Sequence, residues 1–375
     1  MAELFSNAGN ITVQQVVMWA IGAMLIVLAV RRKMEPALLL PMGFGTILVN
    51  LPMSGAVNQI YDGIVERGAL DLLFDAGVAN ELFPLLLFIG IGAMIDFSPL
   101  LTNPKLMLFG AAAQFGIFFT LSLAALLGFE LRDAASIAII GAADGPTSIF
   151  VANFFKSEYI GAITVAAYSY MALVPMVQPP VIRLLTTQRE RRIRMPNAPQ
   201  KVSRLARILF PIAITVLTGI VSPRSVALIG FLMFGNLLRE CGVLDTLSET
   251  AQKVLANLVT LLLGLTISTR MQAAQFLARE TLMILALGLV AFLFDTAGGV
   301  IFAKLLNLFL PEGRKINPMI GAAGISAFPM SARVVHRMGL AEDNQNFLLM
   351  HAAGVNVSGQ IASVIAGGMI LNMLG

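Results

Sequence analysis

The sequence predicts an all-α polytopic membrane protein built from two inverted-topology repeats. Its composition, a series of long apolar segments and two similar interrupted motifs support this fold class. Hydrophobic residues make up 57% of the 375 residues and charged residues 12%, against roughly a quarter charged in soluble domains. Apolar stretches long enough to cross a bilayer recur from end to end. We therefore expect one integral membrane unit of about ten crossings, without a separate soluble domain.

Cysteine and histidine are too scarce for several classes of function. The chain has one cysteine and two histidines. A disulfide framework needs paired cysteines, and zinc or haem centres need several soft ligands. Redox chemistry and a zinc centre are therefore not expected.

Basic residues predict the orientation of the chain. Arg31, Arg32 and Lys33 close the first apolar stretch, and a second cluster occupies the polar segment from about 186 to 207. Its members are Arg189, Arg191, Arg192, Arg194, Lys201, Arg204 and Arg207. By the positive-inside rule, both clusters face the cytoplasm and the N-terminus lies outside. The net charge of +4 then reports topology rather than nucleic-acid binding, with docking of a soluble partner as the alternative for the second cluster.

Six apolar segments precede the basic divider, and a similar series follows it. The first series lies near 13–30, 37–51, 81–95, 104–128, 134–155 and 158–183. The second lies near 204–221, 225–238, 255–269, 278–297, 317–335 and 343–372. Six full crossings from an outside start would leave the divider outside, so one segment must re-enter. The segment 37–51 is short and interrupted by Pro41, Gly43 and Gly45, which makes it the best candidate.

The second series repeats this plan, because its short second member contains Gly230 and Gly235. Five crossings and one re-entrant segment per half place the halves upside-down relative to each other, as in secondary transporters. This predicts a first repeat at 1–185, a cytoplasmic linker at 186–203 and a second repeat at 204–375. Both termini are then outside. Paired re-entrant segments further suggest elevator-like sliding of one bundle against the other.

Corresponding segments of the two halves carry similar motifs. Gly141 to Ser148 reads GAADGPTS, and Gly321 to Phe328 reads GAAGISAF. Glycine and proline interrupt each helix and free backbone groups that only protein or a hydrated cavity can satisfy. In the first motif, Asp144 is an acid at bilayer depth, which is a functional candidate by default.

A carboxylate beside freed carbonyl groups suits a small hard cation such as Na⁺. Asn317 and Asn356 can add amide oxygens, and Ser326, Thr147 and Ser148 can add hydroxyls. Packing alone explains the glycines but not Asp144.

Other polar residues in apolar sequence have two interpretations each. Arg333 is either a cation at a helix end or a ligand for a carboxylated substrate, because a guanidinium matches a carboxylate. Tyr168 and Tyr170 are either interfacial or buried hydroxyls that pass a proton. Asp295 is either a helix cap or part of a second cation site.

Five strings resemble the β subunit of the sodium-transporting carboxylic-acid decarboxylases over essentially the whole chain. They are GIGAMIDFSPLL, GAADGPTSIFVA, AAYSYMALVPMVQPP, NPMIGAAGISAFPMSARVV and HAAGVNVSGQIAS. The family serves oxaloacetate, methylmalonyl-CoA and glutaconyl-CoA decarboxylases. The resemblance implies a biotin-dependent Na⁺ pump in the bacterial cytoplasmic (inner) membrane, in which the β subunit decarboxylates carboxybiotin, consumes a proton and exports Na⁺.

The resemblance also implies roles and partners. Asp144, Asn317, Gly321, Ser326 and Asn356 would bind Na⁺. Tyr170 would serve the proton route, Arg333 would handle carboxybiotin or a proton, and both count with Ser326 as catalytic residues. A separate biotin carrier subunit would present carboxybiotin, beside a carboxyltransferase α subunit and a small membrane-anchored γ/δ subunit. The β chain would also form a homo-oligomer in membrane lipid.

Two other hypotheses remain open from the sequence. A Na⁺-coupled secondary transporter of an organic anion would share the broken helices without needing biotin. A structural anchor would explain the hydrophobicity but not Asp144 with Arg333. Which acid the complex decarboxylates is not readable from this chain, although its compact length leans toward an acyl-CoA decarboxylase on resemblance alone.

Overall fold

The computed structural model describes residues 9–33, 36–61, 63–196, 202–327 and 329–375. Lys201 of the second basic cluster and Phe328 of the second motif lie outside the described residues. Within them the chain is almost entirely helical, and the one hairpin, of strands β1 (Gln59–Tyr61) and β2 (Ile64–Glu66), is antiparallel. The predicted all-α membrane class is confirmed.

The first half runs from α1 to α10. Its elements are α1 (Val13–Arg32), α2 (Pro36–Val49), α3 (Ala69–Phe74), a π-helical turn η2 (Asp75–Ala79), α4 (Leu82–Met94), α5 (Ser98–Thr102), η3 (Pro104–Leu106), α6 (Met107–Ala113), α7 (Phe115–Leu126), α8 (Leu131–Ala138), η4 (Ile139–Ala142), α9 (Gly145–Phe154) and α10 (Ile160–Leu185). Its motif segment, from α8 to α9, breaks between η4 and α9, where glycine and proline follow Asp144.

The linker helix α11 (Gln188–Arg191) joins this half to the second. The second half contains α12 (Arg204–Val221), η5 (Pro223–Ser225), α13 (Val226–Glu240), α14 (Asp245–Thr250), a π-helical turn η6 (Ala251–Leu255), α15 (Ala256–Ile267), η7 (Ser268–Arg270), α16 (Ala273–Phe276), α17 (Arg279–Phe309), η8 (Glu312–Arg314), η9 (Pro318–Gly324), α18 (Met330–Glu342) and α19 (Leu349–Leu374).

Both halves follow the same order of elements. Each has a long helix, a short helix, a helix with a π-helical turn, a long segment, a segment broken at a 3-10 turn, and a long closing helix. The packing also corresponds, because α2 of the first half contacts α15 while α13 of the second half contacts α4. The division into two repeats and the inverted orientation of the halves both stay predictions.

Among the described residues, five helices are long and apolar enough to span a membrane, or seven if each bent pair counts as one span. The two motif segments are divided into shorter helices at glycine and proline. The expected total of about ten crossings stays a prediction. Side chains such as Leu126 and Leu184 are more than 80% exposed, as lipid-facing residues would be. The chain is a multi-pass membrane protein.

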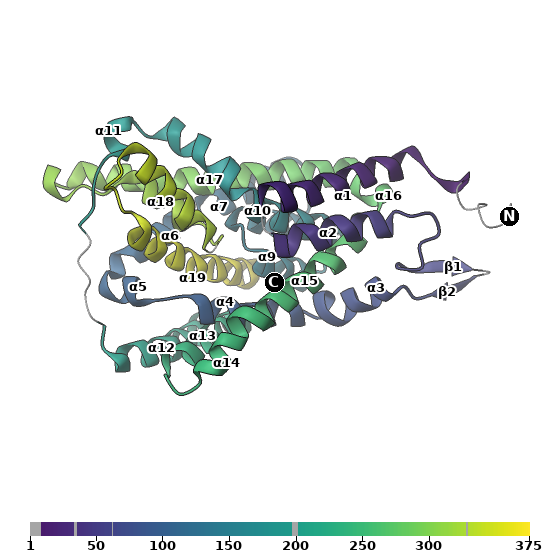
Figure 1. The fold of residues 1–375 in the computed structure, drawn as a ribbon, viewed down its shortest axis with the longest axis horizontal. Helices are drawn as coiled ribbons and strands as arrows, with labels where there is room; N and C mark the ends of the chain where they lie inside the picture. Colours follow the sequence, from purple (N-terminus) through teal and green to yellow (C-terminus); the bar gives the residue numbers. More distant parts are fainter. Residues whose placement is uncertain (1–8, 34–35, 62, 197–201, 328) are drawn as a thin grey trace.

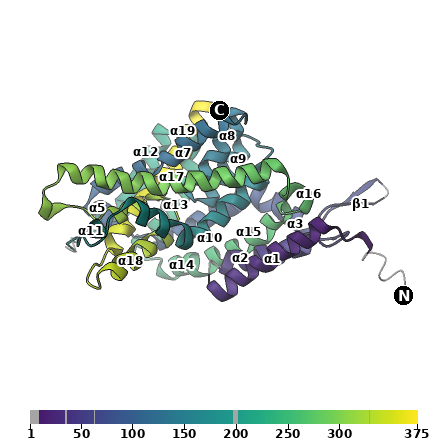
Figure 2. The same cartoon turned by 90° about the horizontal axis from the view of Figure 1, so that it is seen from above.

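Figures 1 and 2 show an elongated molecule with α17 along its length. The β1–β2 hairpin lies at one end of the long axis, and the linker helix α11 lies with α18 at the other. The expected cytoplasmic linker is therefore at the end opposite the hairpin. The two broken segments and α19 form the buried centre between these ends.

Candidate functional site

Asp144 occupies the break in the first motif. Ala143 takes a left-handed conformation, with φ at 51°, and Asp144 is extended, so the chain leaves η4 and restarts as α9. The Asp144 carboxylate caps this new helix, accepting hydrogen bonds from the Thr147 hydroxyl at 2.6 Å and the Thr147 amide at 3.5 Å. Helix N-termini stabilise anions. Asp144 is only 3% exposed and therefore lies in the protein interior rather than in lipid.

The two broken segments meet directly. The backbone amide of Ser326, just after η9, donates a hydrogen bond of 2.9 Å to the carbonyl of Ala142, at the end of η4. The Ser326 hydroxyl donates to the carbonyl of Gly359 on α19 at 3.0 Å. We call this region, with the facing side of α19, the crossing. It joins residues about 180 positions apart in the sequence, as the two similar motifs led us to expect.

One face of α19 supplies three polar side chains to the crossing. Asn356, Gln360 and Ser363 are spaced four and three residues apart and so share a helix face. Ser363 donates to the Asp144 carboxylate at 3.2 Å, and Gln360 donates to the carbonyl of Ser326. The Asn356 amide group donates to two carbonyls of the second broken segment, at 3.0 and 2.7 Å.

Several oxygens of the crossing have no hydrogen-bond partner among the described residues. They are Asn356 Oδ1, Gln360 Oε1 and the hydroxyl of Tyr168, and all are buried. The Tyr168 ring packs so closely on Gly145 that a Cβ there would overlap it. A buried acceptor without a donor is costly, unless a bound cation satisfies it. Carboxylate, amide and hydroxyl oxygens are the ligands that hard cations prefer.

Tyr170 and Arg333 lie apart from this cluster of contacts. The Tyr170 hydroxyl donates to the carbonyl of Leu285 on α17, and its ring packs against Gly288. Arg333 lies on α18, exposed, and forms no ion pair with any described residue. Its guanidinium is therefore available to a carboxylate from outside the chain.

Asn317 and Gly321 have different surroundings from those of Asp144. Asn317 caps η9, accepting from the Met319 amide at 3.1 Å, and donates to the carbonyls of Arg191 and Ile193 at 2.8 and 2.9 Å. Gly321 packs backbone to backbone against Gly299 of α17. The structure thus brings Asp144, Ser326 and Asn356 into one cluster of contacts, and places Asn317 against the linker. Sodium binding by Asn317 and Gly321 stays a prediction.

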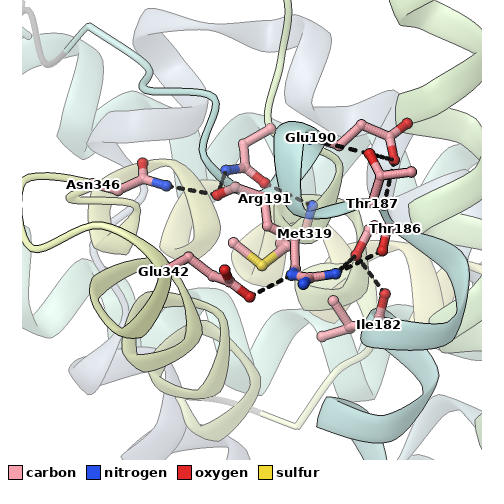
Figure 3. A network of polar contacts seen from close by, with 9 residues as sticks. Ile182, Thr186, Thr187, Glu190, Arg191, Met319, Glu342 and Asn346 are labelled. Carbon is pink, nitrogen blue, oxygen red and sulfur yellow. Dashed lines mark hydrogen bonds and ion pairs between the residues drawn. The ribbon is translucent and has the colours of Figure 1, made fainter.

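The linker is fixed to the second half by a polar network that we call the linker clasp. Figure 3 shows the Arg191 guanidinium between Glu342 and the carbonyl of Thr186, at 2.6 Å from each. The Arg191 carbonyl accepts hydrogen bonds from Asn317 and from Asn346, both at 2.8 Å. These contacts give part of the basic cluster a structural role, beside the topology that the sequence predicted.

The clasp extends beyond Arg191. Arg194 contacts Asp343 with both ends of its guanidinium, at 2.6 and 3.0 Å, and Lys304 pairs with Glu190 at 3.2 Å. The hydrogen bond from Arg191 lowers the pKa of Glu342, and that from Arg194 lowers the pKa of Asp343. Both acids are therefore ionised near neutral pH and hold the linker.

Ser363 and Gln360, which contact Asp144 and Ser326, are not among the residues that we predict from the sequence for the sodium site, and Tyr168 is considered there only as an interfacial residue or for proton transfer. The signal was present in HAAGVNVSGQIAS, where Asn356, Gln360 and Ser363 follow helical spacing. Serine and glutamine in a membrane helix often only stabilise helix packing. What distinguishes these two is that Ser363 contacts Asp144 and Gln360 contacts the carbonyl of Ser326.

Comparison with known proteins bears on this geometry. Residues 14–374 match the family model of the Na⁺-transporting oxaloacetate decarboxylase beta subunit. The chain belongs to this family. It is 48% identical to the methylmalonyl-CoA decarboxylase subunit beta of Veillonella parvula over 97% of this chain and 94% of the relative.

Two further relatives have other substrates in their names. The glutaconyl-CoA decarboxylase subunit beta of Acidaminococcus fermentans is 47% identical over 96% of this chain and 93% of its own. The probable oxaloacetate decarboxylase beta chain of Vibrio cholerae is 44% identical over 95% and 94%. The chain is thus a homologue of sodium-transporting decarboxylase β subunits. The buried carboxylate of Asp144 therefore lies in a protein of a sodium-transporting family.

Proposed function

We propose that this chain is the β subunit of a biotin-dependent decarboxylase sodium pump in the bacterial inner membrane, with both termini outside. It couples decarboxylation of carboxybiotin to Na⁺ export. One observation carries this proposal: the two broken segments meet at Asp144, beside buried oxygens without partners among the described residues. A carboxylate at membrane depth is costly unless it handles ions. The family membership supports sodium as that ion.

The proposed Na⁺ site consists of Asp144, the Asn356 amide oxygen and oxygens near Ser326. Ser363 and Thr147 hold the carboxylate, and Tyr168 covers the Gly145 side. Asn317 and Gly321 belong to the second broken segment, as Ser326 does. They are proposed to shape the path of Na⁺ to the site and to serve as ligands when this segment moves. Elevator-like sliding of one bundle would move this segment past α19.

Loss of CO₂ from carboxybiotin breaks a C–N bond and leaves a nitrogen that takes one proton. In the proposed chemistry, Arg333 binds the incoming carboxylate, because its guanidinium is exposed without an ion pair in the described part of the chain. Ser326 is proposed to serve the exchange of a proton for Na⁺ at Asp144, because its amide donates to the carbonyl of Ala142, two residues before Asp144. Tyr170 serves the proton route only after its hydrogen bond to Leu285 breaks.

The proposed complex contains a carboxyltransferase α subunit, a biotin carrier subunit, a small membrane-anchored γ/δ subunit and several β chains. The substrate of the complex is proposed to be an acyl-CoA. The relatives named methylmalonyl-CoA and glutaconyl-CoA decarboxylase subunit beta are 48% and 47% identical to this chain, against 44% for the probable oxaloacetate decarboxylase beta chain of Vibrio cholerae. The substrate itself would contact the α subunit, so the β chain does not select it.

Reconstituted vesicles test the proposal. The purified complex should drive ²²Na⁺ uptake when the decarboxylase substrate is added, and avidin or removal of the biotin carrier should abolish it. A Na⁺-coupled organic-anion transporter is the alternative, supported by the same crossing and by Arg333. Uptake of Na⁺ that needs an organic anion but is insensitive to avidin would favour the alternative and reject the pump.

A further inference from the structure

Asp295 is a second fully buried carboxylate that the proposed sodium site does not use. It lies on α17, one turn from Ala291 on one side and one turn from Gly299 on the other along the same face, and is 0% exposed. Gly299 packs on Gly321 of the second motif, and Ala291 packs on Gly141 of the first. Asp295 therefore lies where α17 passes both broken segments.

Two glycines open the space around this carboxylate. Gly116, at the start of α7, lies against the Asp295 backbone, and Oδ1 of Asp295 accepts from the Ile117 amide at 3.2 Å. Its other oxygen, Oδ2, faces Gly141, where an added Cβ would come within 2.7 Å of it. One oxygen thus caps the half-helix that restarts after the break at Gln114, and the other lies beside the first motif.

Oδ2 has no hydrogen-bond partner within the described residues, and no described cationic side chain pairs with Asp295. Three more buried side-chain oxygens also lack partners among the described residues: that of Thr296, beside Asp295 in the sequence, and those of Gln114 and Thr120, three residues on either side of Ile117. A helix N-terminus compensates a buried carboxylate only in part. The free oxygen remains unsatisfied unless a cation binds it.

We propose that Asp295 is a second cation-exchange site, whose Oδ2 takes one monovalent cation beside the Gly141 turn. The occupant is Na⁺ or a proton, since either neutralises a carboxylate. A helix-cap role requires only the hydrogen bond to Oδ1. It does not explain why Oδ2 lies buried close to Gly141 without a partner among the described residues. The site is distinct from Asp144, which caps α9 and contacts Ser363.

Asp295→Asn is the informative variant, because its amide oxygen can keep the cap on Ile117 while the charge is lost. Equilibrium binding of ²²Na⁺ to the purified complex, without substrate, should fall by one ion per β chain in Asp295→Asn if the occupant is Na⁺. If it is a proton, the Na⁺ count stays unchanged, and Asp295→Asn removes the infrared carbonyl band of a protonated carboxyl group. Either result supports the site and names its occupant.

Asp96→Asn is the matched control, since Asp96 also accepts from a backbone amide at a helix start, that of Ser98 at 2.8 Å. It should change neither readout. An unchanged Na⁺ count together with an unchanged carboxyl band in Asp295→Asn overturns the inference, as does an equal loss in Asp96→Asn. The inference rests on the proposed function only because it takes Na⁺ as the transported ion. If Asp144→Asn leaves the number of bound Na⁺ ions per β chain unchanged, the proposed sodium site at Asp144 is rejected, while the result for Asp295→Asn still tests the second site.

Discussion

The crossing and the linker clasp use the same residue types for opposite purposes. In the clasp, the Asn317 side chain is fully used: its amide group donates to two linker carbonyls and its oxygen accepts from Met319. In the crossing, the Asn356 amide group likewise donates to two carbonyls, but its oxygen has no partner among the described residues. Satisfied polar groups hold structure, whereas the unsatisfied oxygen of Asn356 supports the binding site that we propose at the crossing.

The acidic residues of the clasp and of the crossing also differ in whether they have a charged partner. Glu342 and Asp343 of the clasp face Arg191 and Arg194. Asp144 faces only hydroxyl and amide groups in the described structure. An acid paired with arginine needs no other cation, while an unpaired buried acid does. The following four experiments test this contrast, from the largest expected effect to the smallest.

Asp144→Asn should have the largest effect. Asp144 is the only charged group among the proposed ligands in the described part of the chain, and its loss should cost about 3 kcal/mol, which corresponds to roughly a 100-fold weaker Na⁺ affinity. The dependence of decarboxylation on Na⁺ concentration in the purified complex measures it. Asp343→Asn is the control at the clasp and should leave that dependence unchanged. Full coupling of decarboxylation to Na⁺ uptake in Asp144→Asn vesicles would contradict the sodium site.

The two asparagines give a direct comparison. Asn356→Ala removes a proposed ligand and should weaken Na⁺ binding about tenfold, because one good hydrogen-bonding or ligand oxygen contributes on the order of 1.5 kcal/mol. Asn317→Ala should instead speed tryptic cleavage of the linker, which loses two hydrogen bonds. If Asn317→Ala weakens Na⁺ binding as much as Asn356→Ala does, the predicted ligand role of Asn317 is supported and the contrast between the two regions fails.

The tyrosines separate a structural hydroxyl from a free one. Tyr170→Phe removes a hydrogen bond to Leu285 and should lower stability by about 1 kcal/mol. Tyr168→Phe removes a hydroxyl without a partner in the described part of the chain, so the melting temperature should not fall. Reduced pumping by Tyr168→Phe at unchanged stability would assign function to that hydroxyl. A clear loss of stability would show that a partner exists.

The stability of the linker clasp should depend on pH. This is the smallest of the four expected effects. The pKa of Glu342 is lowered below 4.5 by Arg191, so its contribution is complete above that value and is lost as the pH falls through the lower, folded value. Hydrogen exchange of the linker amides, corrected for intrinsic rates, should therefore rise as the pH falls below 4.5. Glu342→Gln should exchange faster already at pH 7. A pH-independent linker would show that the ion pair does not hold it.

Much of the fold was readable from composition and pattern. Apolar segments predicted the all-α membrane class, because the bilayer demands long apolar helices. The linker and the two repeats, which the basic clusters predicted, stay predictions. Element details were less predictable. The π-helical turns η2 and η6 occur at matching places in the two halves. Their sequences, DAGVA in η2 and AQKVL in η6, nevertheless share no pattern from which the turn could be predicted. Packing decides such turns, rather than local propensity.

By itself the sequence determined that Asp144 is exceptional, because a carboxylate within apolar sequence next to glycine and proline is costly without a function. It also determined the family, through motifs spread along the whole chain. Only the tertiary structure decided which polar groups have partners. Asn317 and Asn356 are the same residue type, but the Asn317 amide group donates to the linker and the Asn356 amide group donates to the second broken segment. The carbonyls that accept these hydrogen bonds lie on distant segments of the chain, so only the packing of those segments assigns them.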